Sequence, residues 1–172
     1  MDAKNARMLT RYNVWANKLM FEAVAKLPDG EATKPRASLF RNMVHTLNHN
    51  YVIDRIWQAH LQGRDHGYKE RNTQDHPPLD ALWRLQQDVD AWYVDWSDQL
   101  SDAEVEQKIG FTLIGGNRGE MTRGEILMHI LGHRHYHRGF VCDMFFQVPT
   151  RPPTMDLPVY LREVAEQAAA NK

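Results

Sequence analysis

The stretch His129-Ile-Leu-Gly-His133-Arg-His-Tyr-His137-Arg-Gly139 places a histidine at every fourth position. Residues four apart on an α-helix lie one turn apart on the same face, so these three histidines would share one stripe. Imidazoles at this spacing can reach a single divalent cation, as they do on the helix of zinc metalloproteases. The glutamate that serves as general base in those enzymes is absent, because Arg134 follows His133. The run therefore predicts a helix with a metal site, but not a zinc protease.

A second pair of histidines, His45 and His49, has the same spacing within residues 42–57. One helix rarely completes a metal site, and two facing helices of a bundle can hold one between them. The alternative is a set of hydrogen-bonded core histidines, in which each buried neutral imidazole needs partners for both nitrogens. A metal satisfies several of these nitrogens at once, which favours a metal site. Spacing alone leaves all five histidines as candidate ligands.

Composition narrows the class of protein. A chain of 172 residues is typical of one domain, here 1–172, and can bury roughly two-thirds of its unfolded surface. The net charge is −1 and no block of like charge stands out, which argues against nucleic-acid and membrane-surface partners. The lone Cys142 fits a reducing compartment. Residues 1–7 lack the apolar core expected of a signal peptide, and no apolar run approaches the ~20 residues needed to span a bilayer. We therefore expect a cytoplasmic protein with no membrane span.

Apolar residues recur at steps of three and four over most of the chain, which predicts helices. Ser38 is a plausible N-cap for the second helix, and Thr122 with Glu125 forms a capping-box pattern before the histidine helix. Two short strands around a glycine-rich turn are expected within residues 105–121. The expected helices are 4–27, 38–61, 78–100, 123–147 and 156–170. The fold class is all-α: an antiparallel four-helix bundle with a short β-hairpin before the last bundle helix and an extra C-terminal helix.

Four stretches of the sequence, in this order and spacing, resemble the DinB family of damage-inducible bacterial proteins, part of the DinB/YfiT-like group of metalloenzymes. The stretches are Tyr12-Asn-Val-Trp-Ala-Asn17, Thr46-Leu-Asn-His49 followed by Asp54-Arg-Ile-Trp57, Ile114-Gly-Gly-Asn-Arg-Gly-Glu-Met-Thr-Arg123, and His133-Arg-His-Tyr-His137-Arg-Gly139.

The resemblance implies a bundle in which one histidine of the second helix and two of the last helix hold a metal. In the family the second-helix histidine precedes an aromatic residue by eight positions, which selects His49. The pair that adjoins Arg-Gly is His133 and His137. Three other residues, His45, His129 and Arg138, then become neighbours of the ligands or lining of the pocket. The resemblance assigns no catalytic residue beyond the metal ligands, and it implies a homodimer.

Three imidazoles leave a cation with open positions, as in catalytic sites. We expect zinc first and nickel second, although imidazole ligands alone do not separate them. Some relatives resemble transferases that use low-molecular-weight thiols such as bacillithiol, mycothiol or glutathione. The expected function is therefore a metal-dependent thiol transferase, in which a metal-bound thiolate attacks a small electrophile. The alternatives are a stress-induced metal-binding protein without turnover and a hydrolase that uses metal hydroxide.

Overall fold

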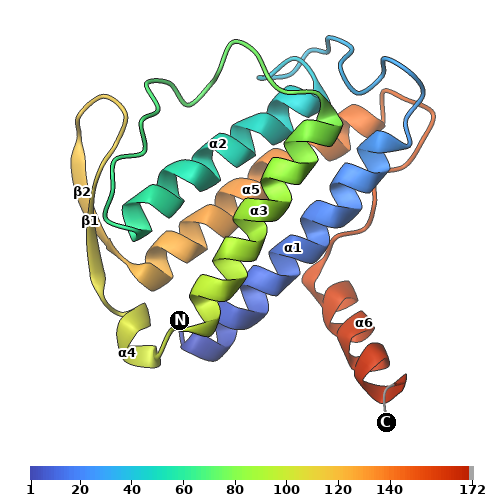
Figure 1. The fold of residues 1–172 in the computed structure, drawn as a ribbon. Helices are drawn as coiled ribbons and strands as arrows, with labels where there is room; N and C mark the ends of the chain where they lie inside the picture. Colours follow the sequence, from blue (N-terminus) through green and yellow to red (C-terminus); the bar gives the residue numbers. More distant parts are fainter. Residues whose placement is uncertain (171–172) are drawn as a thin grey trace.

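Four long helices form the body of the molecule (Figure 1). A computed structural model describes residues 1–170. Each bundle helix packs against two others: α1 and α2 both contact α3 and α5. The expected four-helix bundle is confirmed. Its helices are α1 (Ala3–Ala25), α2 (Met43–Leu61), α3 (Leu79–Asp98) and α5 (Arg123–Phe145).

The bundle is not antiparallel throughout, which corrects the expectation from sequence. Helices α2 and α3 run in the same direction, because the connection of residues 62–78 returns along the length of the bundle before α3 begins (Figure 1). Helices α2 and α5 run in opposite directions (Figure 1). The long connection lies alongside α2, where its backbone can reach the side chains of that helix.

A short helix and a hairpin precede α5. Helix α4 (Asp102–Val105) was not expected from the sequence; it begins at Ser101 with a capping box to Glu104. Strands β1 (Lys108–Thr112) and β2 (Arg118–Thr122) pair antiparallel, as expected. Phe111 lies opposite Gly119, and its ring occupies the space that a Cβ atom at residue 119 would fill. The hairpin leads directly into α5, whose capping box between Thr122 and Glu125 is confirmed.

Helix α2 begins later than expected. Its N-cap is Asn42, whose side chain accepts a hydrogen bond from the backbone N–H of His45, and Ser38 lies in the preceding turn. Arg41 adopts a φ of 64°, an uncommon left-handed conformation for a residue other than glycine. This irregular turn lets the buried Phe40 fold back over α2 instead of continuing the helix.

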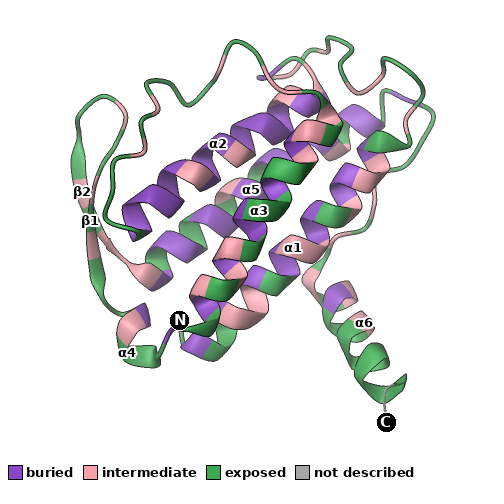
Figure 2. Cartoon of the chain, in the orientation of Figure 1, coloured by how far each residue is buried: buried purple, intermediate pink, exposed green. Residues whose placement is uncertain are grey.

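Buried residues face the middle of the bundle on all four helices (Figure 2). Two large apolar clusters fill this core, one around Met20, Met43 and Met144 and the other around Trp57, Val89 and Ile130. The C-terminal helix α6 (Leu157–Ala170) stands largely outside the bundle, contacts α1 and buries only Tyr160 (Figures 1 and 2). Within residues 1–170, no helix is long and apolar enough to cross a bilayer.

Candidate metal centre

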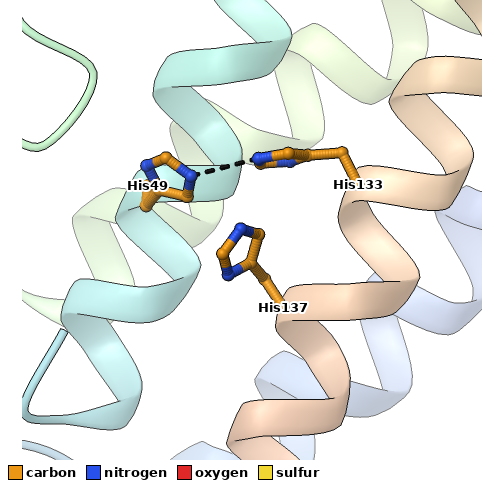
Figure 3. Close-up of side chains that lie close together, drawn as sticks. All are labelled: His49, His133 and His137. Carbon is orange, nitrogen blue, oxygen red and sulfur yellow. Dashed lines mark hydrogen bonds between the residues drawn. The ribbon is translucent and has the colours of Figure 1, made fainter. Parts of the chain in front are cut away.

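Three imidazoles converge between α2 and α5 (Figure 3). His49 on α2 and His133 and His137 on α5 each offer a ring nitrogen, and these three atoms all lie within 4.8 Å of one another. The Nε2 atoms of His49 and His133 are 3.1 Å apart. Two ligands at about 2.1 Å from one cation, at angles of roughly 90–110°, are themselves about 3.0–3.4 Å apart. The spacing of this pair therefore fits a shared cation.

The contacts of His49 set its tautomer. Its Nδ1 lies 3.1 Å from the backbone carbonyl of Arg71, and a carbonyl only accepts, so Nδ1 carries the proton. The lone pair is thus on Nε2, which faces His133 and His137. A ligating histidine commonly donates its other N–H to a backbone carbonyl in this way. Phe40 stacks on the His49 ring at a centroid distance of 4.4 Å, which holds the ring plane in place.

Burial keeps these imidazoles neutral. It lowers the pKa of His49, and it lowers the pKa of His133 to about 3, with the neighbouring His137 and His49 adding to the effect. Burial and then His49 lower the pKa of His137 to about 4. At neutral pH all three rings therefore present a lone pair, the form that binds a metal. Within residues 1–170, the buried Nδ1 atoms of His133 and His137 have no hydrogen-bond partner.

A cavity of about 590 Å³ opens beside the three histidines. Its wall is mostly apolar and aromatic, with Trp57 from α2, Tyr136 from α5 and the hairpin residues Leu113 and Ile114. Arg71, Asn72 and Asn117 supply its other polar side chains besides the histidines. A group bound at the three histidines would therefore have open positions facing a hollow large enough for a small molecule.

The other predicted site residues lie in three different places. His129 lines the same cavity and packs edge-on against Trp57 at 5.0 Å between ring centroids. His45 does not join the cluster, since its Nε2 lies 2.7 Å from the carbonyl oxygen of Thr73 in the long connection. Arg138 faces the opposite side of α5, where it donates to the side-chain oxygens of Asn13 and Asn17. Of the three, only His129 lies at the pocket.

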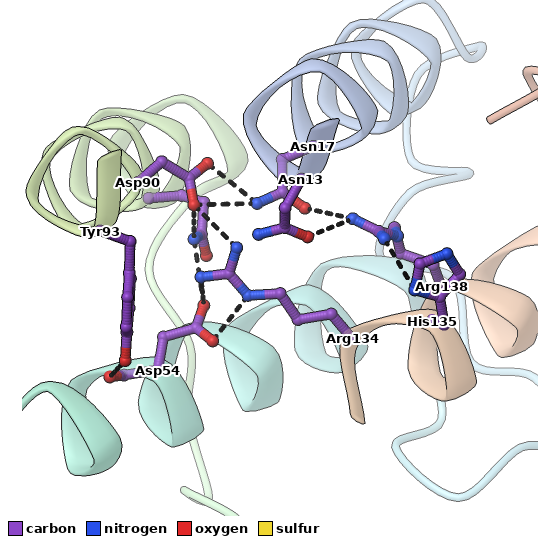
Figure 4. Close-up of polar contacts among 9 residues, drawn as sticks. Asn13, Asn17, Asp54, Asp90, Tyr93, Arg134, His135 and Arg138 are labelled. Carbon is purple, nitrogen blue, oxygen red and sulfur yellow. Dashed lines mark hydrogen bonds and ion pairs between the residues drawn. The ribbon is translucent and has the colours of Figure 1, made fainter. Parts of the chain in front are cut away.

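The side of α5 that faces away from the cavity carries a buried polar layer (Figure 4). Arg134 donates from Nε to Asp54 on α2 at 2.7 Å and from Nη1 to Asp90 on α3 at 2.9 Å. All three side chains are at most 2% exposed. Asn17 on α1 also donates to Asp90. The layer ties α5 to the other three bundle helices directly behind His133.

Electrostatics hold this layer together. The carboxylates of Asp54 and Asp90 raise the pKa of Arg134 above its ordinary value, despite complete burial. Burial raises the pKa of Asp54 to about 6, although Arg134 opposes that shift. From the sequence, Asp54 received no role in this layer, and Arg134 was noted only as the residue that stands where the zinc proteases have a glutamate. The sequence does carry a signal for this layer, because each of three helices has a charged residue among its apolar positions: Asp54, Asp90 and Arg134.

Comparison with known proteins identifies the family and the fold of this chain. The profile of the DinB family matches residues 1–168. The chain is 23% identical over 162 residues to the protein DinB of Bacillus subtilis (strain 168), and the match covers 89% of this chain and 91% of that protein. The fold is similar to that of a DinB-like protein from Bacillus cereus ATCC 10987, with a TM-score of 0.61 and 13% sequence identity. That match covers 85% of this chain and 94% of the other.

Proposed function

Because the chain belongs to the DinB family, we propose that His49, His133 and His137 bind one divalent transition metal, preferably zinc, and that the protein is a metal-dependent thiol transferase. Its substrates are a low-molecular-weight thiol and a small electrophile. The observation that carries the proposal is the convergence of three neutral imidazoles at the wall of a cavity. A structural zinc site would instead be closed by a fourth protein ligand.

The chemistry of the cavity favours a thiol over water as the nucleophile. A bound zinc ion supplies a strong local positive charge that deprotonates a thiol at neutral pH. Within the described residues, no aspartate or glutamate lines this cavity. A carboxylate general base, which activates water in the zinc proteases, is therefore missing. A thiol needs less help to lose its proton, since its ordinary pKa is about 8.5.

The residues around the histidines have roles in this reaction that follow from their positions. Arg71 orients His49 through its backbone carbonyl, and Phe40 covers the ring. The apolar walls formed by Trp57, Leu113 and Ile114 would hold a hydrophobic electrophile and exclude water from it. Such exclusion strengthens the electrostatic effect of the cation on the thiol.

Metal content tests the ligand set separately from activity. Protein purified without a nickel column and loaded with zinc should contain one zinc per chain by mass spectrometry of the dissolved metal. The variants His49→Ala, His133→Ala and His137→Ala should each lose it. His45→Ala is the matched control on the same helix and should keep it. Full zinc content in all three ligand variants would refute the site.

Activity is tested by measuring loss of free thiol in the presence of a halogenated electrophile, with zinc-loaded and chelated protein. Glutathione, mycothiol and bacillithiol are compared. Turnover that requires zinc and at least one of these thiols supports the transferase. Ester hydrolysis that requires zinc and no thiol would replace it with a hydrolase. Stoichiometric metal binding with neither activity would leave a metal-binding protein without turnover.

A further inference from the structure

A second and larger cavity, of about 780 Å³, lies next to the cavity beside His49, His133 and His137, hereafter the metal cavity. Its walls are the C-terminal end of α2, the start of the long connection and the β-hairpin. Leu113 and Ile114 line both cavities, so the hairpin tip forms a shared wall between them. Four lining glycines at positions 63, 110, 115 and 119 contribute no side chain to fill the space.

The charge of this second cavity is mostly positive. Arg64, Lys69 and Arg118 line it, and Asp65 is its one acidic residue within the described part of the chain. The carboxylate of Asp65 already accepts a hydrogen bond from the backbone N–H of Gly67. Arg64 is also engaged, since it donates to Gln62 and to the carbonyl of Asp65. Lys69 and Arg118, by contrast, are exposed to solvent and take part in none of the side-chain hydrogen bonds or ion pairs among residues 1–170.

A buried histidine adds a second, independent observation. His60 on α2 is 8% exposed and lines the cavity. Its Nε2 atom is buried and has no hydrogen-bond partner within residues 1–170. Buried polar atoms of folded proteins nearly always have a partner, from protein, water or a ligand. His60 also packs edge-on against Trp57, which lies about one helical turn earlier on α2 and lines the metal cavity.

We propose that this second cavity binds an anionic group of a small molecule, a carboxylate or a phosphate, through Lys69 and Arg118. Two cations without side-chain partners, in a hollow that is also lined by His60 with its one unpaired buried nitrogen, match the charge and hydrogen-bonding needs of such a group. If the proposed function is correct, the thiol substrate carries an anionic end that binds here while its sulfur reaches the neighbouring metal cavity.

The test uses the full-length, metal-free protein, so its result does not depend on the metal chemistry. Inorganic phosphate and succinate are titrated separately and followed by the backbone amide signals of Gly110, Gly115 and Gly119 in two-dimensional NMR. Sodium chloride at matched ionic strength controls for screening. The double variant Lys69→Gln/Arg118→Gln removes the proposed anchors. Lys108→Gln removes a cation of the same hairpin that pairs with Glu120 outside the cavity.

We expect saturable shifts of these glycine signals with phosphate, succinate or both, and the preferred anion identifies the group. The double variant should raise the dissociation constant of the anion by at least about tenfold. Lys108→Gln should leave it within about twofold of the value for the unaltered protein. Shifts that match those in sodium chloride, or that persist unchanged in the double variant, would overturn the proposal. The fold of each variant is checked by its amide spectrum away from the hairpin. Failure here with intact zinc binding would leave the metal centre standing.

Discussion

Replacing Arg134 by methionine should destabilise the protein severely while leaving the three proposed metal ligands unchanged in sequence. The change leaves two carboxylates, Asp54 and Asp90, buried without the guanidinium that neutralises them. Removing one partner of a buried ion pair costs about 3–5 kcal/mol. The free energy of unfolding of a domain of this size is about 5–15 kcal/mol. Each kcal/mol of lost stability lowers its melting temperature by about 2–4 °C. The expected loss in melting temperature is therefore roughly 6–20 °C.

The assay is thermal unfolding followed by circular dichroism, with Arg84→Met as the matched control. Arg84 pairs with Asp80 on the surface of α3, where both side chains are about 70% exposed, and such pairs contribute about 0–1 kcal/mol. Adding Asp54→Asn and Asp90→Asn to Arg134→Met should recover part of the loss, because no buried charge then lacks a partner. The reasoning is refuted if Arg134→Met costs no more than Arg84→Met at pH 7.

Three further outcomes are expected. The metal-free protein should lose stability as the pH falls from about 6.5 towards 4. The unfolded chain protonates its histidines there, whereas His133 and His137 stay neutral until about pH 3 and 4. Asp54, with its pKa raised to about 6, acts in the opposite direction, since its contribution is lost as the pH rises, but one carboxyl does not outweigh two imidazoles. A higher urea midpoint at pH 5 than at pH 7 in the presence of a chelator would contradict this. Removing zinc should lower the melting temperature by about 5–10 °C if the free metal is at a hundredfold excess over Kd, because binding then contributes about 2.7 kcal/mol. Helical circular dichroism at 25 °C should survive chelation, and its loss would mean that the metal builds the fold. Cys142→Ala should retain zinc and any thiol-transfer activity, because Cys142 lines a different cavity and burial raises the pKa of its thiol. Activity lost in a zinc-replete Cys142→Ala protein would point to a protein nucleophile.

Helical periodicity was enough to predict the bundle helices, because apolar residues recur at steps of three and four along each one. Helix α2 is buried on nearly all sides, which this periodicity did not indicate. Their ends were harder to predict. Ser38 and Asn42 are both acceptable N-caps, and only the tertiary packing of Phe40 against His49 selects the later start. Helix α4 was missed although Ser101 and Glu104 form the capping-box pattern that marks a helix start.

The histidines illustrate what spacing does and does not determine. The i, i+4 rule placed five of them on two helices but did not rank them. The family resemblance singled out His49, His133 and His137, which are the three that the fold brings together. The backbone carbonyl of Arg71, which orients His49, was not predictable, because a loop carbonyl leaves no mark in the sequence. The three histidines of α5 share one stripe as expected, but their burial differs along it: His129 is exposed, His133 is half-buried and His137 is buried.

Helix α5 places imidazoles and guanidiniums at adjacent positions, His133 beside Arg134 and His137 beside Arg138, and directs them about 100° apart around its axis. One inserted or deleted residue ahead of them would turn the rest of the helix by about 100° relative to its start. A deletion would turn the guanidiniums towards the cavity, and an insertion would turn the imidazoles towards the buried polar layer. In both cases the buried aspartates would lose their partner. A single substitution in α5 therefore disturbs the contacts of one side chain, whereas a change of length ahead of His133 disturbs all of these contacts together. Among relatives, we expect length polymorphism to be confined to the hairpin, the long connection and the segment before α6.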